Sequence, residues 1–380
     1  MKKIFCLLLI AILIFPQKIS AVELNLSAQS AILIEAKTGQ VIYSKNPDIQ
    51  LRPASITKIM TLLLIFDAVK SGKITLEDTV TVSEHAASMG GSQVFLEPGE
   101  TQTVNTMIKC ISIASANDAC VAMAEHISGS EEAFVADMNK RAKDLGMSNT
   151  NFINCCGLDA DGHVTSARDV ATMSRELINN YPEIHDYSTI WMDTITHVTK
   201  RGSKEFVLNN TNKLIKQYEG ATGLKTGSTS KAGFCLSATA KRNDIELISV
   251  VMCATDSKKR ISDSITLLNY GYSVCSIYSD DNMPKLTPLK VKGGLDNSLE
   301  IKYKSKFVHL FTDKIDTGKI TSRAEYIDNL KAPIKSGDTV GQLTYYHDNT
   351  AIGSVEIVAA KEIPKAGYKD YLKLLAKNVF

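Results

Sequence analysis

The sequence predicts an α+β fold in which helices flank an antiparallel sheet, followed by a small all-β region. Two strand-like runs come first, a long helical insertion follows, and two more strands and a closing helix complete the first part. This order is typical of an antiparallel sheet that carries helices. After about residue 281 the pattern changes to short alternating segments separated by turn residues.

The N-terminal segment is predicted to be a secretory signal peptide, residues 1–21. A basic start, Met1-Lys2-Lys3, precedes an apolar run at residues 4–15. That run is shorter than the about 20 residues that a spanning helix needs. Small Ala21 marks the expected cleavage point, so the chain is predicted to be exported. The alternative is an uncleaved anchor.

The mature chain is predicted to begin with a hairpin at residues 31–45 and a helix at residues 52–66. Pro53 suits the first helical position. Four apolar residues of this helix share one face by their spacing, namely Ile59, Leu62, Leu63 and Phe66. Ser55 lies on the same face and Lys58 borders it, so a hydroxyl and an ammonium are directed toward the core.

The remaining elements complete a predicted domain at residues 24–280. The expected helices are residues 104–112, 117–127, 131–145, 166–178 and 257–272, a loop spans 151–165, and two strands joined by a polar turn span 234–254. Ser130 is a good N-cap for the third helix, and Gly146 follows its end.

The C-terminal part is predicted to be an all-β domain at residues 281–360 and a basic amphipathic helix at residues 361–380. Five Lys against Glu362 and Asp370 give that tail a net charge of +3, with tyrosines and leucines on another face. This pattern fits an anchor at the membrane surface. The alternative is a helix that packs on its own domain.

Composition excludes several function classes. The 380 residues are 44% hydrophobic and 22% charged, as in ordinary globular proteins, and the formal net charge of +2 gives no reason to expect a nucleic-acid partner. Seven cysteines remain without the signal segment and form no C-x-x-C motif, so we predict mostly buried thiols rather than a disulfide framework. The adjacent pair Cys155-Cys156 has no evident role in the sequence.

Ser55 and Lys58 form a Ser-x-x-Lys motif that suits nucleophilic catalysis. A serine hydroxyl needs a neighbouring base, and a lysine amine becomes a base when burial lowers its pKa. A spacing of three residues on a helix brings the two groups within reach. The motif alone is weak, because Ser228 and Lys231 repeat it.

Two further motifs follow in order. Ser115-Ala116-Asn117 lies in a bend between two helices, where Asn117 could simply cap the second helix. Lys225-Thr226-Gly227 precedes an apolar strand, where it could simply be a turn. Lys37-Thr38-Gly39 is an identical tripeptide in the predicted N-terminal hairpin.

The ordered set of three motifs resembles the penicillin-binding proteins and serine β-lactamases. More narrowly, the chain is similar to the low-molecular-mass D-alanyl-D-alanine carboxypeptidases from about residue 30 to its end. The stretches that carry the likeness include AKTGQVIYSKNPDIQLRPASITKIMT, ASANDACVAMAEHISGS, GLDADGHVTSARD and GLKTGSTSKAGFCLSATA. The resemblance implies a β-lactamase/transpeptidase-like fold, a location at the outer face of the cytoplasmic membrane or in the cell wall, and no cofactor.

The resemblance also implies catalytic roles. Ser55 would attack the penultimate D-alanine of a peptidoglycan stem peptide, and Lys58 would be the general base. Ser115 would relay a proton to the leaving D-alanine, and Asn117 would hold the substrate amide and Lys58. Lys225 would supply positive potential. β-Lactams would acylate the same serine as covalent inhibitors.

The implied substrate-binding residues are Lys225, Thr226, Gly227, Ser228 and Arg260, with Thr226 and Arg260 on the terminal carboxylate. The backbone N–H groups of Ser55 and Ser228 would form the oxyanion hole. The chain departs from the family at two positions. Ser228 follows Lys-Thr-Gly, where relatives often have His, and Cys156 precedes Gly-Leu, where relatives often have His or another residue.

Other readings explain less of the sequence. A class A β-lactamase would need a Glu-x-x-Leu-Asn loop, and residues 145–225 contain none. Gly-x-Ser-x-Gly and His-Glu-x-x-His are absent from the sequence, so neither a Ser-His-Asp hydrolase nor a metal site is predicted. A β-lactamase-like hydrolase and a non-catalytic wall protein that binds stem peptides stay as alternatives.

Overall fold

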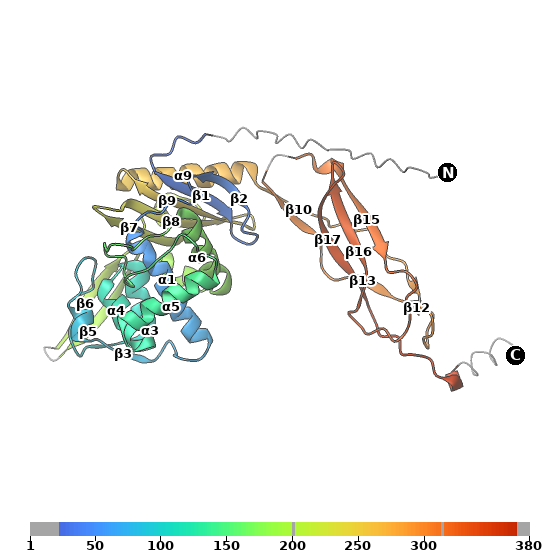
Figure 1. The fold of residues 1–380 in the computed structure, drawn as a ribbon, viewed down its shortest axis with the longest axis horizontal. Coiled ribbons are helices and arrows are strands. Elements are labelled where there is room, and N and C mark those ends of the chain that lie inside the picture. Colours follow the sequence, from blue (N-terminus) through green and yellow to red (C-terminus); the bar gives the residue numbers. More distant parts are fainter. Residues whose placement is uncertain (1–22, 200–201, 313–314, 371–380) are drawn as a thin grey trace, which may run out of the picture.

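The computed structural model describes residues 23–199, 202–312 and 315–370, so the predicted signal peptide lies outside the described residues. Figure 1 shows two regions side by side. We call residues 24–275 the sheet-and-helix region and residues 276–370 the β region. The predicted α+β class, with an all-β C-terminal part, is confirmed.

A five-stranded antiparallel sheet forms the centre of the sheet-and-helix region. Its strands run, from one edge to the other, as β2 (Val41–Lys45), β1 (Ser30–Glu35), β9 (Ile245–Ala254), β8 (Gly233–Arg242) and β7 (Ala221–Thr229). The predicted hairpin at 31–45 and the strand pair at 234–254 are confirmed. The sheet joins the two ends of the region, because the N-terminal β1 pairs with the late β9.

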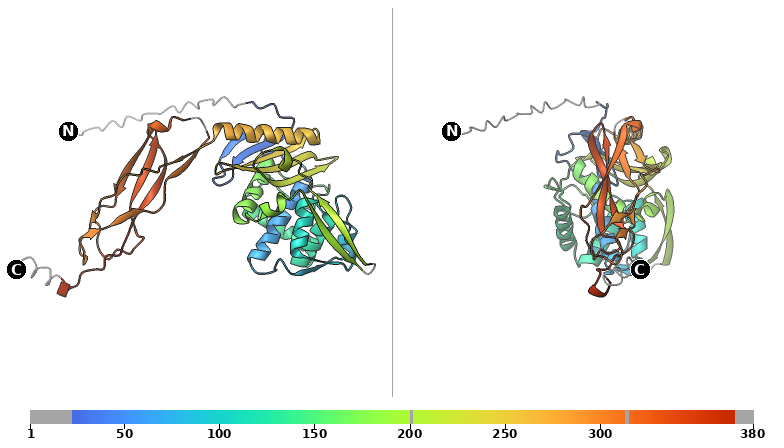
Figure 2. Two further views of the ribbon diagram at one scale, coloured as in Figure 1. Left: turned by 180° about the vertical axis from the view of Figure 1, so that it is seen from behind. Right: turned by 90° about the vertical axis from the view of Figure 1, so that its right-hand side faces the viewer.

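Both faces of this sheet are buried, and the alternation of side chains along β1 shows how. Ile32 and Ile34 face the core formed with most of the helices, whereas Leu33 on the opposite face packs under α9 (Ser257–Val274). A Cβ at Gly271 of α9 would lie 2.8 Å from Leu33, so glycine allows this helix to approach the sheet. Figure 2 shows α9 covering the sheet and leading toward the β region.

The other face of the sheet carries the helical insertion. Its longer helices are α1 (Lys58–Lys70), α3 (Val104–Ile113), α4 (Asn117–Ser128), α5 (Glu131–Asp144) and α6 (Ala167–Asn180). All five match predicted helices, and Ser130 caps α5 through its hydroxyl, as predicted. The helix predicted from residue 52 was placed too early, because a 3-10 turn, η1 (Ala54–Thr57), precedes α1.

Several elements were not predicted. One is β7 itself, because the sequence placed Lys225-Thr226-Gly227 before a strand and not within one. The others are short or exposed. They are α2 (Glu84–Ala87), α7 (Ile184–Ser188), α8 (Leu214–Gln217), the pair β3 (Thr79–Thr81) with β4 (Thr101–Thr103), and the hairpin of β5 (Met192–Thr199) with β6 (Gly202–Asn209). The β5–β6 hairpin buries few side chains, so the sequence carries only a weak apolar alternation there.

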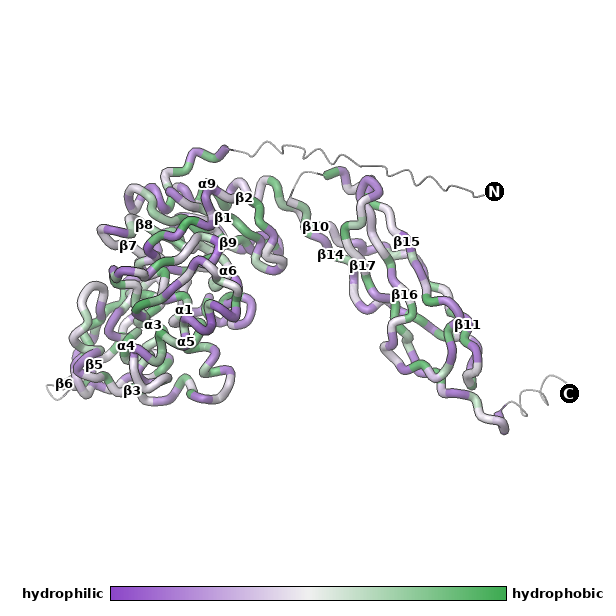
Figure 3. Tube along the Cα trace, viewed as in Figure 1, coloured by the Kyte–Doolittle hydropathy of each residue, from purple (hydrophilic) through white to green (hydrophobic). Residues whose placement is uncertain are grey.

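The β region is built from short strands around its own apolar core. A four-stranded antiparallel sheet runs as β13 (Ile301–Tyr303), β17 (Thr350–Ala359), β16 (Thr339–His347) and β15 (Ile320–Tyr326), beside the pairs β10 (Ser276–Ser279) with β14 (Val308–Phe311) and β11 (Leu289–Lys290) with β12 (Ser298–Leu299), and the turn η2 (Thr317–Lys319). Figure 3 shows hydrophobic stretches in the strands of both regions. Because β10 pairs with β14, strand pairing with the β region begins before the predicted boundary at residue 280.

The predicted tail helix requires a correction. Residues 361–367 are extended rather than helical, and Ile363 is buried and bridges Ile334, whereas residues 368–370 are helical as predicted. Pro364 interrupts the backbone hydrogen bonding that a helix would need there. Residues 371–380 lie outside the described residues, and within the described ones no helix combines the length and the apolarity that crossing a membrane requires.

Candidate active site

Ser55 lies in η1, at the point where the chain turns into α1. Ala54 before it has φ +50°, an unusual conformation for a residue other than glycine, and is fully packed. A Cβ at Gly157 would lie 1.8 Å from the carbonyl oxygen of Ala54, so the loop after residue 150 presses directly on this turn. Ser55 itself is half-buried, which leaves its hydroxyl accessible.

Lys58 is completely buried one turn after Ser55. Its Nζ lies 3.0 Å from Ser55 Oγ, 2.6 Å from Asn117 Oδ1 and 2.7 Å from the carbonyl oxygen of Cys156. An ammonium has three N–H donors, and three acceptors surround it here. The predicted pairing of Ser55 with Lys58 is therefore present, and the Cys156 carbonyl is a partner that the sequence did not indicate.

Asn117 begins α4 and is not the N-cap that the simpler reading gave it. Ala116 is the N-cap residue, and the Asn117 side chain turns toward Lys58 instead. Its Nδ2 donates to the carbonyl oxygen of Gly90 at 2.7 Å, which fixes the orientation of the amide. A Cβ at Gly91 would lie 2.8 Å from this Nδ2, so glycine makes room for the contact.

Lys225 reaches the site from the opposite side, on the edge strand β7. Its Nζ donates to Ser115 Oγ at 2.8 Å, and both residues are buried. Burial and, next, the nearby Lys58 hold the pKa of Lys225 well below its usual range. Ser115 has φ +62° in the bend before α4, which lets one short segment place Ser115 and Asn117 on two different lysines.

The other copies of these motifs lie elsewhere. Lys37-Thr38-Gly39 forms the turn between β1 and β2, where Gly39 has φ +76° and Thr38 bonds to Glu35. Ser228 is exposed at the end of β7, and Lys231 follows in the turn to β8. Neither copy therefore makes the buried contacts that Lys58 makes with Asn117 and Cys156, or that Lys225 makes with Ser115.

The remaining predicted residues follow Lys225 along β7. Thr226 Oγ1 lies 2.8 Å from Thr211 Oγ1, a contact that the sequence did not indicate. A Cβ at Gly227 would lie 2.8 Å from the backbone N of Ser55, so glycine keeps the approach to that N–H open. Arg260 of α9 donates to the carbonyl oxygens of Gly227 and Cys235 at 3.1 and 3.4 Å.

His163 links the loop after residue 150 to η1 beneath the site. The backbone N–H of Ile153 donates to its Nδ1 at 3.1 Å, so the ring proton sits on Nε2 and is shared with Thr57 Oγ1 at 2.9 Å. Burial lowers the pKa of His163 to about 4. The neutral ring therefore ties the loop to the residue before Lys58, a role that no sequence motif indicated.

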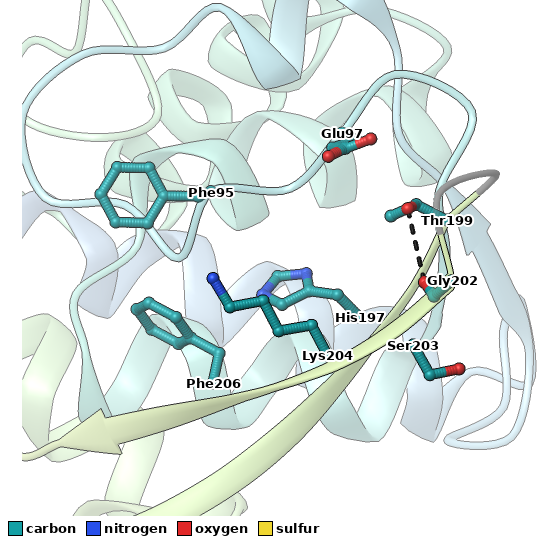
Figure 4. Close-up of a pocket in the computed structure, with 8 residues that line it drawn as sticks. All are labelled: Phe95, Glu97, His197, Thr199, Gly202, Ser203, Lys204 and Phe206. Carbon is teal, nitrogen blue, oxygen red and sulfur yellow. Dashed lines mark hydrogen bonds between the residues drawn. The ribbon is translucent and has the colours of Figure 1, made fainter.

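A cavity of about 570 Å³ lies elsewhere, between the loop that carries Phe95 and the β5–β6 hairpin. Figure 4 shows Phe95 and Phe206 at one end of the cavity and Thr199 and Gly202 at the other, with Lys204 and His197 between these ends. None of the predicted site residues lines it. In the described residues the side chains of the three motifs thus lie together where η1, the α3–α4 bend and β7 meet.

Comparison with known proteins agrees with this geometry. Residues 17–256 match the family described as D-alanyl-D-alanine carboxypeptidase, and residues 272–365 match the C-terminal domain of penicillin-binding protein 5. The chain is 43% identical to D-alanyl-D-alanine carboxypeptidase DacF of Bacillus subtilis, over 92% of this chain and 90% of the relative. It is 34% identical to DacA of Escherichia coli K12, over 94% and 89%. A solved structure of penicillin binding protein 5 from Haemophilus influenzae superposes with a TM-score of 0.75 at 30% identity, covering 91% of this chain and 100% of that one.

Proposed function

The chain belongs to the D-alanyl-D-alanine carboxypeptidase family and is a serine-type enzyme, and from this premise we propose that it removes the terminal D-alanine of peptidoglycan stem pentapeptides through an acyl-enzyme on Ser55. The observation that carries the proposal is the pair of buried lysines. Lys58 and Lys225 approach from opposite walls, and each is hydrogen-bonded to a serine. Burying two lysine amines this close together is unfavourable when both are protonated, so we expect the arrangement to serve a function.

Acylation uses the Ser55–Lys58 contact. Lys58 Nζ first releases one proton of its ammonium form to solvent. The resulting amine then takes the hydroxyl proton of Ser55, and Oγ bonds to the carbonyl carbon of the penultimate D-alanine. The carbon–nitrogen bond to the terminal D-alanine then breaks, and Lys58 returns the proton, through Ser115, to the leaving nitrogen, so that its amine is neutral again. Free D-alanine and an ester on Ser55 result.

Deacylation reverses the proton path with water in place of the leaving amine. Water gives a proton to Lys58, its oxygen adds to the ester carbon, and Ser55 Oγ leaves and regains a proton. Asn117 keeps Lys58 aligned in both steps, because its oxygen accepts from Nζ while its nitrogen is anchored on the carbonyl oxygen of Gly90.

Substrate binding is assigned to β7 and its neighbours. Thr226, Lys225 and Arg260 supply donors and positive potential for the terminal carboxylate. The N–H groups of Ser55 and Ser228 stabilise the oxyanion, and removing one such donor typically costs about 3 kcal/mol of transition-state stabilisation. The absence of a side chain at Gly227 supports this assignment, since any Cβ would crowd the backbone N of Ser55.

The decisive experiment combines a fluorescent penicillin with a stem pentapeptide. We expect covalent labelling of the wild type, no labelling of Ser55→Ala, and loss of one alanine from the pentapeptide by mass spectrometry. Absence of label on a folded wild type overturns the acyl-enzyme proposal. Rapid release of hydrolysed penicillin without accumulation of label favours the β-lactamase-like alternative.

The proposal includes export, a division into domains and a membrane-surface location. The basic, apolar N-terminal segment supports export. We propose the two predicted domains, 24–280 and 281–360, with their boundary moved to residue 275 because β10 pairs with β14. For the anchor, the test is truncation after Asp370, because Ile363 and Ala366 before it are buried in the β region. Full-length protein should sediment with anionic vesicles, and the truncated protein should not. Equal sedimentation of both rules out the anchor.

A further inference from the structure

Three buried thiols lie directly behind the catalytic lysine and have no part in the proposed chemistry. Cys155 Sγ and Cys156 Sγ are 3.6 Å apart, and the thiol of Cys120 of α4 interacts electrostatically with Cys156. Cys156 Sγ also donates to the backbone oxygen of Asn117 at 3.5 Å. All three thiols are free and essentially inaccessible to solvent.

A carboxylate completes the cluster and connects it to the surface. One oxygen of Glu131 and the sulfurs of Cys155 and Cys156 all lie within 4.8 Å of one another. Glu131 Oε1 accepts from the backbone N–H of Cys155 at 3.1 Å, and its Oε2 lies 3.1 Å from His85 Nε2. The His85 side chain is 54% exposed, so polar ligand groups lead from solvent to the thiols.

We propose that Glu131, Cys155 and Cys156 form a binding site for one thiophilic divalent cation, such as Zn²⁺ or Cd²⁺. Thiolate, imidazole and carboxylate are the ligand types that such ions prefer. A zinc–sulfur bond of about 2.3 Å in a tetrahedron places two sulfurs about 3.8 Å apart, and the two sulfurs here are 3.6 Å apart. The ion therefore enters between them with little movement, and a water molecule would complete its four ligands, while His85 holds the Glu131 carboxylate in place.

Binding exchanges protons for the metal without changing the local charge. Each of the two thiols loses its proton to solvent, so the added +2 is balanced by two new thiolates. The field at Lys58 therefore changes little. The mechanical effect is larger, because the ion links α5 to the loop whose carbonyls hold α1: Cys155 O accepts from Thr61, and Cys156 O accepts from Lys58.

The first test is titration of the full chain, reduced and freed of metal, with Cd²⁺. We expect one ion per chain, the ultraviolet charge-transfer band of a cadmium–thiolate bond, and a rise in the melting temperature, since a ligand of the folded state stabilises it. Cys155→Ser and Glu131→Gln should each lower the affinity at least tenfold. His85→Ala should lower it less.

Cys253→Ser is the matched control, because it removes a partly exposed thiol of β9 outside the cluster. It should bind cadmium like the wild type. Melting curves without metal show whether each variant is folded, and the conservative Glu131→Gln keeps the test valid if Cys155→Ser is unstable. Loss of the band in Cys253→Ser, or its retention in both Cys155→Ser and Glu131→Gln, overturns the proposal.

Penicillin labelling of the same samples separates this inference from the proposed function. A wild type that labels at Ser55 but binds no cadmium refutes the cation site alone. A wild type that binds cadmium but does not label refutes the acyl-enzyme alone.

Discussion

The sheet-and-helix region and the β region are both built on antiparallel strands, but they bury different kinds of side chain. The first buries Lys58, Lys225, Asp118 and Asp263 along with its apolar core. In the described part of the β region the buried positions are apolar residues, glycine or tyrosine. Buried charge costs stability unless it is paired. Asp118 and Asp263 accept hydrogen bonds from backbone N–H groups, whereas the two lysines lie in the proposed active site.

The sharpest test of this difference uses the two Lys-Thr-Gly tripeptides. Lys225→Ala removes the buried partner of Ser115 and the positive potential of β7, so we expect acylation by penicillin to slow about a thousand-fold. Lys37→Ala changes an exposed turn residue of the identical tripeptide and should acylate at the wild-type rate. Stopped-flow measurement of labelling decides; equal rates for the two variants contradict the assignment of Lys225.

A core deletion in the β region should separate stability from activity. Leu343 of β16 is completely buried in the apolar cluster of that region. Leu343→Ala should lower the free energy of unfolding of the β region by about 3 kcal/mol. The rate of penicillin acylation should stay unchanged at denaturant concentrations too low to unfold the β region. A matching loss of acylation would mean that the two regions unfold together.

Acid should weaken the sheet-and-helix region through His163, whose pKa is about 4 in the folded state. An unfolded histidine has a pKa near 6.5, so between those values the unfolded chain binds a proton that the folded chain does not. The free energy of unfolding therefore falls as pH falls through this window, by about 3 kcal/mol in total.

His163→Gln retains an amide near Thr57 and Ile153 but does not titrate. Denaturant unfolding of wild type and variant at a series of pH values measures the effect. The variant is expected to be less stable at pH 7.5 but to lose less stability on acidification. Identical pH slopes for the two proteins would remove His163 from this account.

The smallest expected effect is at Thr211, which contacts the site through Thr226. Thr211→Val keeps the shape of the side chain and removes one hydrogen bond, worth about 1 kcal/mol. Because that bond orients a residue assigned to the substrate carboxylate, we expect KM for the pentapeptide to rise several-fold with kcat little changed. A change confined to kcat would instead place Thr211 in the chemical steps.

The local elements were largely predictable, and the exceptions have physical reasons. Long periodic helices such as α5 and α6 and the apolar pair β8–β9 carry strong patterns. The β5–β6 hairpin buries few side chains, so its sequence shows little of the apolar–polar alternation that predicts a strand. Residues 361–367 carry part of a helical pattern, but Ile363 is buried against Ile334 and pairing with the β region prevails.

By itself, the sequence determined the order of the elements, the three motifs and the family to which they belong, because these depend on local pattern and on residue identity. Only the tertiary structure decided which copy of the Ser-x-x-Lys and Lys-Thr-Gly motifs lies in the proposed active site. Packing of β7 against η1 sets Gly227 beside the backbone N of Ser55, and the bend at Ser115 lets Lys58 and Lys225 meet separate partners. Contacts between residues far apart in the chain make that distinction, and no local spacing encodes them.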